Sequence, residues 1–236
     1  EYDILLSICQ QDDIAGLERV ISNRKVDGVV LLRTFEDDKQ IEFLKGKNVP
    51  FVATGSTGYA GVKQIDHDHE NACRELTSIV LMNNGPRIAL LGGNERIVVN
   101  KRRLKGFRNA FAMAGKQVVP ELVFLNLENR ISINHAVEEA IEKKAECILC
   151  MDDGICSQVL RKLRQAHINV PGDVRVASFY NSSVLQNNVP SITSLAFDAK
   201  ELGVVACKNL LGQIEGEEVP SKMLLAYEVI LKESTK

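Results

Sequence analysis

The sequence predicts an α/β protein of two lobes, each a parallel sheet flanked by helices. Short apolar runs alternate with longer segments of helical periodicity, which is typical of strands buried on both faces of a parallel sheet. Each apolar run stops abruptly at a polar or glycine-rich patch, and three turn clusters divide the chain. Four of the runs end at Leu32, Leu91, Cys150 and Phe179, before Arg33-Thr34, Gly92-Gly93, Met151-Asp152 and Tyr180-Asn181.

The individual elements follow from these two patterns, short apolar runs for the strands and helical periodicity for the helices. Strands are predicted at 3–8, 27–32, 50–54, 87–91, 121–125, 146–150, 174–179, 222–226 and 228–232. Helices are predicted at 13–24, 37–46, 69–83, 97–114, 132–143, 153–167 and 198–213. Because strand and helix alternate through the first seven strands, the chain is expected to be built of βαβ units with right-handed crossovers.

Three turn clusters indicate where the chain crosses between the lobes. Each cluster contains a proline, and they lie at 83–86, 189–191 and 216–220. The predicted first lobe is 1–86 plus 195–218, and the predicted second lobe is 87–194 plus 219–236. Ligands of open α/β sheets bind beyond the carboxyl ends of the strands, so we expect a ligand in the cleft between the lobes.

The composition is that of an ordinary globular protein of one or two domains. Hydrophobic residues make up 45% and charged residues 25% of the 236 residues, and the formal net charge is −2. This charge excludes nucleic-acid binding by bulk basicity, and no apolar stretch reaches the roughly 18–20 residues of a membrane span. Several of the six cysteines lie inside apolar runs, which indicates buried thiols and a reducing compartment.

The basic segment 100–108 contains one candidate binding residue. Apolar residues recur at helical spacing from Leu104 to Ala114 and predict a core-facing stripe, so most of the basic side chains fall on the solvated side. Arg103 differs, because it lies four residues before Phe107 on the inward edge of the helix. A guanidinium there, near the end of strand 87–91, can donate paired hydrogen bonds to ligand hydroxyls or carboxylates. A surface ion pair is the alternative interpretation.

Two adjacent aspartates, Asp152 and Asp153, follow strand 146–150 and begin a helix. One carboxylate is expected to cap the helix and interact with its dipole. The other is then left to face the crevice and accept hydrogen bonds from sugar hydroxyls. General acid/base chemistry is the alternative, but no second catalytic carboxylate or activated nucleophile accompanies the pair.

Two further motifs are interpreted as structural. In the segment 66–69 (Asp-His-Asp-His), alternate side chains point to opposite sides, so no metal site is expected. Asp68 or His69 is instead expected to cap the following helix. Cys147 and Cys150 stand an odd number of residues apart in a strand, which favours two core positions over a redox or zinc pair. No phosphate-binding loop or nucleophile elbow is present in the sequence.

Taken in order, six motifs resemble the effector-binding domain of LacI/GalR-type transcription regulators. The likeness covers nearly the whole chain; each motif alone is common, whereas their order is specific. Periplasmic sugar-binding proteins share the two-lobe fold, but the third and fifth motifs look more like the regulators. The motifs are Asp66-x-Asp68 before a helix, Arg87-Ile-Ala-Leu-Leu-Gly-Gly93, Arg103-Leu-x-Gly-Phe107, Asp152-Asp153, Val170-Pro-x-Asp-Val174 and Pro190-Ser-Ile-Thr-Ser194.

The resemblance implies a periplasmic-binding-protein-like core whose two lobes are joined by three crossovers. It implies an effector bound between them, a sugar, a sugar phosphate or a similar molecule, sometimes a purine in the family. By position in the motifs, Arg103, Asp152 and Asp68 are the implied effector-binding residues. The resemblance further implies a cytoplasmic homodimer that contacts operator DNA through an N-terminal domain, with no cofactor, no metal, no membrane and no catalysis.

The chain departs from the family pattern in two places. Tyr180 and Asn181 stand where the family often has an aspartate that holds sugar hydroxyls; both are expected in the site, with Tyr180 stacking on a sugar ring or bonding a different group. The opening segment, Glu1 to Leu6, resembles the family's second strand. The first strand, its helix, the hinge and the DNA-reading helix-turn-helix are absent from the sequence, so we expect the native protein to be longer.

Three functions are therefore distinguished. The leading hypothesis is the effector-sensing and dimerisation domain of a transcription regulator, whose effector must bind two states with different affinity. The alternative is a solute-binding protein of a transporter, which would be exported and monomeric; six thiols argue against it. An α/β enzyme is the third possibility, but no nucleophile–base pair or cofactor motif supports it.

Overall fold

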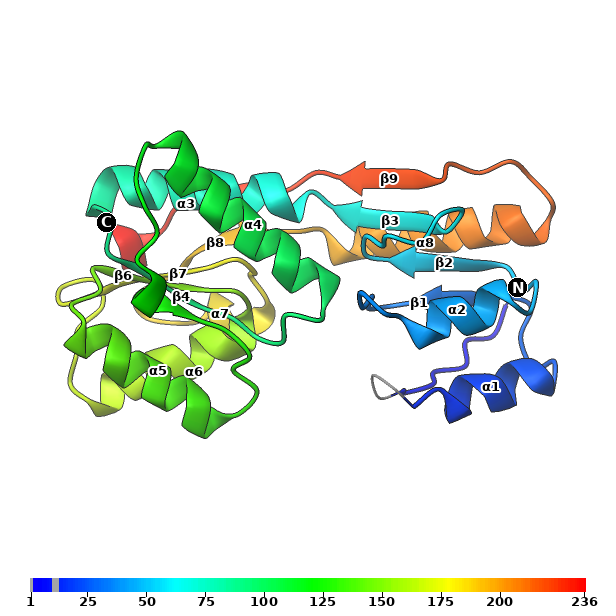
Figure 1. Ribbon diagram of the computed structural model, residues 1–236, viewed down its shortest axis with the longest axis horizontal. Helices are drawn as coiled ribbons and strands as arrows, with labels where there is room; N and C mark the ends of the chain where they lie inside the picture. The colour runs from blue at the N-terminus through cyan, green and yellow to red at the C-terminus, as the bar shows by residue number, and fades with distance from the viewer. Residues whose placement is uncertain (1, 10–12) are drawn as a thin grey trace. The chain divides into compact units, whose positions relative to one another are not determined.

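The structure is a computed structural model that describes residues 2–9 and 13–236, apart from the side chain of Asn84. The chain forms two compact units, drawn in Figure 1. Unit 1 holds the described residues up to His67 together with 96–98 and 199–225, and unit 2 holds 68–95, 99–198 and 226–236. Apart from the short segment 96–98, the chain crosses between the units after His67, Asp198 and Leu225, whereas the crossovers were expected at 83–86, 189–191 and 216–220.

The unit boundaries differ from the predicted lobes. Helix α3 (His69–Asn84), placed by prediction in the first lobe, packs in unit 2, where Leu76 contacts the same apolar cluster as Phe107. Strand β8 (Thr193–Ala196) belongs wholly to the sheet of unit 2, whereas β9 (Lys222–Leu225) pairs with a strand of unit 1. The turn clusters mislead here because a turn residue marks a reversal of the chain and not the unit that the next element joins.

Unit 1 is a four-stranded, fully parallel sheet. Its strand order is β1-β2-β3-β9, formed by β1 (Val29–Leu31), β2 (Phe51–Thr54), β3 (Lys63–His67) and β9. Helices α1 (Ala15–Ser22) and α2 (Lys39–Lys45) share one apolar cluster with the sheet. Helix α8 (Ala199–Ile214) shares the second cluster with Val52 and Ile65. The sheet is therefore covered on both faces, as the apolar runs predict.

Unit 2 is a six-stranded sheet in the order β10-β8-β7-β6-β4-β5. Only β10 (Glu228–Ile230) runs antiparallel to its neighbour, β8. Helices α3 and α4 (Val98–Met113) pack on one face, and α5 (Arg130–Glu142) and α6 (Asp153–Gln165) pack on the other (Figure 1). The remaining elements are β4 (Ile88–Leu91), β5 (Val123–Phe124), β6 (Cys147–Cys150), β7 (Arg175–Ser178), the short helix α7 (Ser183–Gln186) and 3₁₀ turns at Pro120–Leu122 and Glu233–Thr235.

Strand β6 confirms the interpretation of the two cysteines. Cys147 packs with the cluster under α3 and α4, whereas Cys150 packs with the cluster under α5 and α6. Both thiols are fully buried, and burial raises the pKa of Cys147 to about 12. Two side chains on opposite faces of a sheet cannot act as one redox or metal-binding pair.

Some predicted elements differ from the structure. Residues 3–8 form no strand, and Ile4 and Ile8 are almost fully exposed; Glu1, which opens this segment, lies outside the described residues. The strand predicted at 121–125 is reduced to Val123–Phe124 after a 3₁₀ turn. Ala114, assigned to the core stripe of its helix, is exposed because α4 ends one residue before it.

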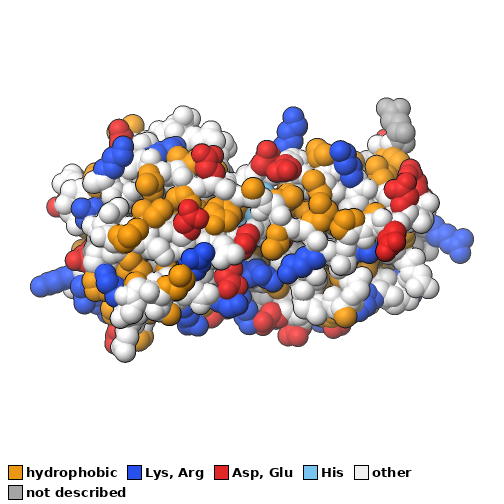
Figure 2. Space-filling view, turned by 90° about the horizontal axis from the view of Figure 1, so that it is seen from above, with side chains coloured by type: hydrophobic (Ala, Val, Ile, Leu, Met, Phe, Trp, Pro, Cys, Tyr) orange, Lys and Arg blue, Asp and Glu red, His pale blue; other side chains and the backbone are white. Residues whose placement is uncertain are grey.

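The surface matches the near-neutral charge. Figure 2 shows acidic and basic side chains interspersed with apolar ones over the face that it presents, rather than gathered into one basic surface. Among the described residues, no helix is both long enough and apolar enough to cross a membrane.

Helices α3 and α4 cross at an unusually close point, which only glycine permits. A Cβ placed on Gly106 would lie 2.3 Å from the carbonyl oxygen of Glu70. Around this crossing, Glu70 accepts a hydrogen bond from Asn109 and pairs with Lys105 at 3.0 Å. The crossing therefore holds the start of α3 firmly against the third turn of α4.

Replacing Gly106 with alanine is expected to lower the melting temperature, because the added methyl group overlaps backbone that cannot easily move. A cost of about 1–3 kcal/mol corresponds to a fall of roughly 2–12 °C, measured by thermal unfolding. The matched control is Gly203→Ala in helix α8, where a Cβ would meet nothing within 4 Å. The control should be neutral or stabilising because alanine is the better helix former. A Gly106→Ala variant as stable as the control would contradict the close crossing.

Candidate functional site

The sheet of unit 2 has a topological switch point between β4 and β6. From β4 the chain goes to β5 on one side, and β6, β7 and β8 lie on the other side. The helix after β4 packs on one face of the sheet and the helix after β6 packs on the opposite face. Where neighbouring connections diverge in this way, the carboxyl ends of the strands leave a crevice for a ligand. Gly92-Gly93 and Asp152 follow the two strands at this place.

Arg103 is the most unusual side chain near this switch point. It is only 7% exposed, and its Nε has no hydrogen-bond partner among the described residues. A buried guanidinium without partners is unfavourable unless something else pairs with it. Arg103 lies one turn before Gly106, on the part of α4 that crosses the start of α3. The structure therefore supplies a mostly buried charged donor with spare hydrogen-bonding capacity.

Asp68 begins α3 on the other side of the same crossing. Its carboxylate caps the helix by accepting hydrogen bonds from the backbone N–H of Asn71 at 3.2 Å and from the Asn71 side chain at 2.6 Å. This confirms that one of the two residues 68 and 69 caps the helix. Burial raises the pKa of the nearby Cys73 thiol; the charge of Arg103 opposes this rise, and the charge of Asp68 adds to it. Arg103 and Asp68 thus lie close enough to one thiol to act on it electrostatically.

Asp152 and Asp153 both have partners within the protein. Asp152 is the N-cap of α6, and its Oδ1 accepts a hydrogen bond from the backbone N–H of Ile155 at 2.8 Å. Asp153 accepts a hydrogen bond from the hydroxyl of Ser182. Oδ2 of Asp152 makes no hydrogen bond within the described part of the chain. One aspartate was expected to cap the helix and the other to face the ligand. In the structure, Asp152 both caps the helix and retains an unused acceptor atom.

Tyr180 belongs to a stack of three rings. Its ring lies nearly parallel to that of Phe197, with centroids 6.2 Å apart and an interplanar angle of 17°. The other neighbour of Phe197 is His69, with centroids 4.5 Å apart. Tyr180 remains partly exposed, while the preceding Phe179 is fully buried. The stack joins the second residue after β7, the first residue after β8 and the first residue of α3.

The structure connects the predicted residues other than Arg103 along one edge of unit 2. Asp68 is followed by His69, whose ring contacts Phe197, and Phe197 stacks on Tyr180. The loop that begins at Tyr180 reaches α6 through the Ser182–Asp153 hydrogen bond. Asn181 lies between these two contacts and is partly exposed.

Sequence reasoning missed Phe197 and His69 as members of this edge. Phe197 follows β8, a strand that was not predicted because Thr193 and Ser194 are polar although fully buried. The signal that could have found Phe197 is the Ser-Ile-Thr-Ser motif, since the residues after a strand end are where a parallel sheet places its ligand contacts.

Unit 1 has a polar carboxyl edge of its own. The backbone N–H and the hydroxyl of Ser56 both donate to Oδ2 of Asp66 at 2.8 Å, and Asp66 is only 5% exposed. Thr34 in turn donates to the carbonyl oxygen of Ser56 at 2.7 Å. Asp66 therefore holds the loop after β2 in place. Among the described residues, no group of three side chains is arranged to hold a metal ion.

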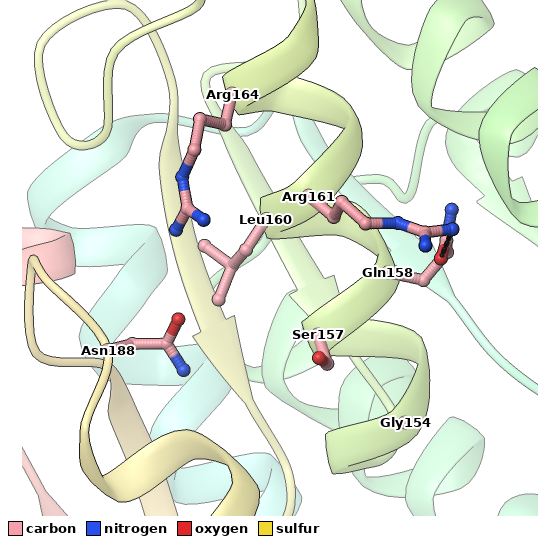
Figure 3. Close-up of a pocket in the computed structure, with 7 residues that line it drawn as sticks. All are labelled: Gly154, Ser157, Gln158, Leu160, Arg161, Arg164 and Asn188. Carbon is pink, nitrogen blue, oxygen red and sulfur yellow. Dashed lines mark hydrogen bonds between the residues drawn. The ribbon is translucent and has the colours of Figure 1, made fainter.

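A separate pocket of about 300 Å³ lies along the flank of α6 (Figure 3). Arg164 and Asn188 lie on one side of it, whereas Arg161 turns toward Gln158 and donates to its side-chain oxygen. None of the predicted effector-binding residues lines this pocket. Its lining is Gly154, Ser157, Gln158, Leu160, Arg161, Arg164 and Asn188.

Comparisons with known proteins agree with this geometry. The family described as periplasmic binding protein-like domain matches residues 81–235. The transcriptional regulator CelR of Thermobifida fusca is 27% identical over 220 residues, covering 91% of this chain and 65% of CelR. The structure of a CelR–cellobiose complex has a TM-score of 0.84 and 27% identity, covering 93% of this chain and 70% of that one. The transcription regulator CcpA of Lactococcus lactis has a TM-score of 0.85 and 25% identity, covering 95% and 85%.

The chain belongs to the periplasmic binding protein-like domain family. Within it, the chain is the effector-binding domain of a LacI-type transcription regulator, as its sequence motifs imply. Because these relatives are transcription regulators, the alternative of a transporter's solute-binding protein is set aside. The chain spans about two thirds of the length of CelR.

Proposed function

We propose that unit 2 binds a sugar-like effector at the switch-point edge through Arg103, Asp68, Asp152, Tyr180 and Asn181. The observation that carries this proposal is the buried Arg103, whose Nε lacks a hydrogen-bond partner among the described residues. Guanidinium donors, carboxylate acceptors and an aromatic face together are the groups that sugar hydroxyls and C–H surfaces need. The CelR–cellobiose complex, a similar structure, supports an effector of this class.

In the whole regulator, effector binding would shift the population between two states of a homodimer. Operator DNA would be read by a further domain, since the relatives are longer DNA-binding regulators. The site is proposed to bind its ligand without turning it over, because no nucleophile–base pair is found at this edge among the described residues. A regulator of this kind acts in the cytoplasm, and the six thiols are consistent with a reducing compartment.

The test is a thermal-shift screen of sugars, sugar phosphates, polyols and nucleobases. At a ligand concentration of about 100 times the Kd, the stabilisation is roughly 2.7 kcal/mol, which corresponds to a rise of about 5–11 °C. Sedimentation velocity on the same sample measures the oligomeric state, and NMR of the recovered ligand shows whether it is unchanged. A screen in which only nucleobases stabilise the protein, or in which the ligand is consumed, would contradict the proposal.

A further inference from the structure

The loop after β4 and the loop after β5 are joined by a reciprocal pair of hydrogen bonds. The backbone N–H of Glu95 donates to Oδ1 of Asn126 at 3.0 Å, and Nδ2 of Asn126 donates to Oε2 of Glu95 at 2.9 Å. The N–H of Asn126 also donates to the carbonyl oxygen of Gly93 at 3.1 Å. The next N–H, that of Leu127, donates to the carbonyl oxygen of Gly92 at 3.0 Å. The two loops therefore prolong the pairing of β4 with β5 beyond the ends of both strands.

The backbone of Asn126 has a conformation that needs an explanation. Its φ is +58°, in the left-handed region that residues other than glycine seldom adopt. The other described non-glycine residues with positive φ follow helices α1, α2, α5 and α6 within three residues, where a left-handed residue commonly ends a helix. Asn126 follows strand β5 instead. Strained backbone of this kind is kept where its surroundings hold it, often at functional sites, and here the bonds to the loop after β4 hold it.

The loop 92–95 lies at the switch point, beside the end of β6. A Cβ placed on Gly92 would lie 2.4 Å from Sδ of Met151 and 3.0 Å from Cδ2 of Leu125. Met151 directly precedes Asp152, the N-cap of α6 and one of the proposed effector-binding residues. A displaced loop would therefore press on the segment that carries Asp152.

The same loop leads toward the helix that carries Arg103. The carbonyl oxygen of Asn94 accepts a hydrogen bond at 2.9 Å from Nδ2 of Asn100, which is buried in the first turn of α4. Asn100 stands about one helical turn before Arg103. The loop is therefore held from two sides, by Asn126 on one and by α4 on the other.

Asparagine suits position 126 for two reasons. It adopts a positive φ more readily than most residues, and its amide carries both an acceptor and a donor. An aspartate would keep the acceptor for the N–H of Glu95 but would place a second carboxylate against Oε2 of Glu95. The reciprocal pair can therefore be broken by one substitution and restored by moving the amide to the other residue.

We propose that Asn126 is a positioning residue of the effector site, which acts through Glu95 by fixing the loop between β4 and α4 in the conformation that the bound effector needs. This inference rests on the proposed function and adds to it a residue that contacts the loop rather than the ligand. A loop that is fixed before binding loses less conformational freedom when the ligand arrives, so the affinity rises without a new ligand contact.

The experiment measures Kd by isothermal titration calorimetry for wild type, Asn126→Asp, Glu95→Gln and the double variant. The probes are D-glucose, D-galactose, maltose, cellobiose and D-glucose 6-phosphate. Asn126→Asp brings two carboxylates together and should weaken binding of the best of these probes roughly 2- to 12-fold, the loss of one net hydrogen bond. Glu95→Gln keeps an acceptor oxygen for Asn126, and the double variant restores a donor–acceptor pair, so both should bind within about twofold of wild type.

A second variant keeps the test decisive if Asn126→Asp does not fold. Asn126→Gly adopts the same φ without strain and removes both side-chain bonds. It should weaken binding by a similar factor. In NMR hydrogen exchange without ligand, the amide of Glu95 should exchange roughly 2- to 12-fold faster than in wild type.

Each outcome separates this inference from the proposed function. Weak binding by Asn126→Asp that Glu95→Gln restores supports the positioning role, because a lost ligand contact at position 126 would not be restored from position 95. If the double variant binds as weakly as Asn126→Asp, the role through Glu95 is overturned. If both Asn126 variants bind as tightly as wild type while Arg103→Met loses binding, the positioning role is overturned and the proposed function stands. If none of the probes binds wild type, the sugar-sensing function fails and this inference fails with it.

Discussion

Replacing Arg103 with methionine is expected to weaken effector binding roughly 10- to 150-fold, the loss that follows removal of a hydrogen-bonded charge worth about 1.5–3 kcal/mol. Methionine keeps much of the aliphatic stem and removes only the guanidinium. Because the Nε of Arg103 has no partner within the described residues, the unliganded variant should be as stable as wild type or more stable. Calorimetric titration measures the affinity and thermal unfolding measures the stability.

The matched control for Arg103 is Lys105→Ala, two residues later on the same helix. Lys105 is exposed and pairs with Glu70, so its loss removes one basic charge from α4 without touching the buried guanidinium. The control should keep wild-type affinity. An Arg103→Met variant that is strongly destabilised but still binds the effector would show that Arg103 is a structural residue.

Replacing Asp152 with asparagine is expected to lower effector affinity by about 10-fold or more while leaving stability nearly unchanged. Asparagine caps a helix as well as aspartate does, so the bond from the Ile155 N–H is retained, but the negative charge on the second oxygen is lost. Asp152→Ala removes both roles and should also lower the free energy of unfolding by about 0.5–2 kcal/mol. The two variants therefore separate the cap from the ligand contact.

Binding measurements and thermal unfolding on both Asp152 variants provide the check. If Asp152→Asn binds as tightly as wild type, the carboxylate serves the helix alone. If Asp152→Ala is as stable as wild type, the N-cap contact contributes nothing, against the geometry at Ile155.

The strongly periodic elements were predictable from the sequence, and the weakly periodic ones were not. Strands β4, β6 and β7 are apolar because helices cover both faces of the sheet, so their sequences mark them clearly. Strand β3 begins with Lys63 and Gln64 and ends with the buried polar residues Asp66 and His67, so composition hides it. Residues 3–8 are apolar yet pair with no described strand, because pairing depends on a partner that local periodicity does not identify.

The features of the candidate site divide in the same way, into those that the sequence could indicate and those that it could not. Asp152 and Tyr180 could be proposed because each stands shortly after the carboxyl end of a recognisable strand, and Arg103 because it lies four residues before Phe107 on the inward edge of its helix; their contacts with an effector stay predictions. The tight approach at Gly106 and the stack of Tyr180 on Phe197 were not predictable, since each joins residues that are distant in sequence. The unit boundary at His67 escaped prediction for a related reason, because the packing of α3 depends on contacts with α4.

The most direct test of the central claim is a crystal structure of the chain with the tightest-binding sugar from the screen. We expect the sugar at the switch-point edge of unit 2, with hydroxyls on Arg103 and Asp152 and a C–H face on Tyr180. A sugar seated instead in the pocket along α6, between Arg164 and Asn188, would contradict the assignment of the effector site.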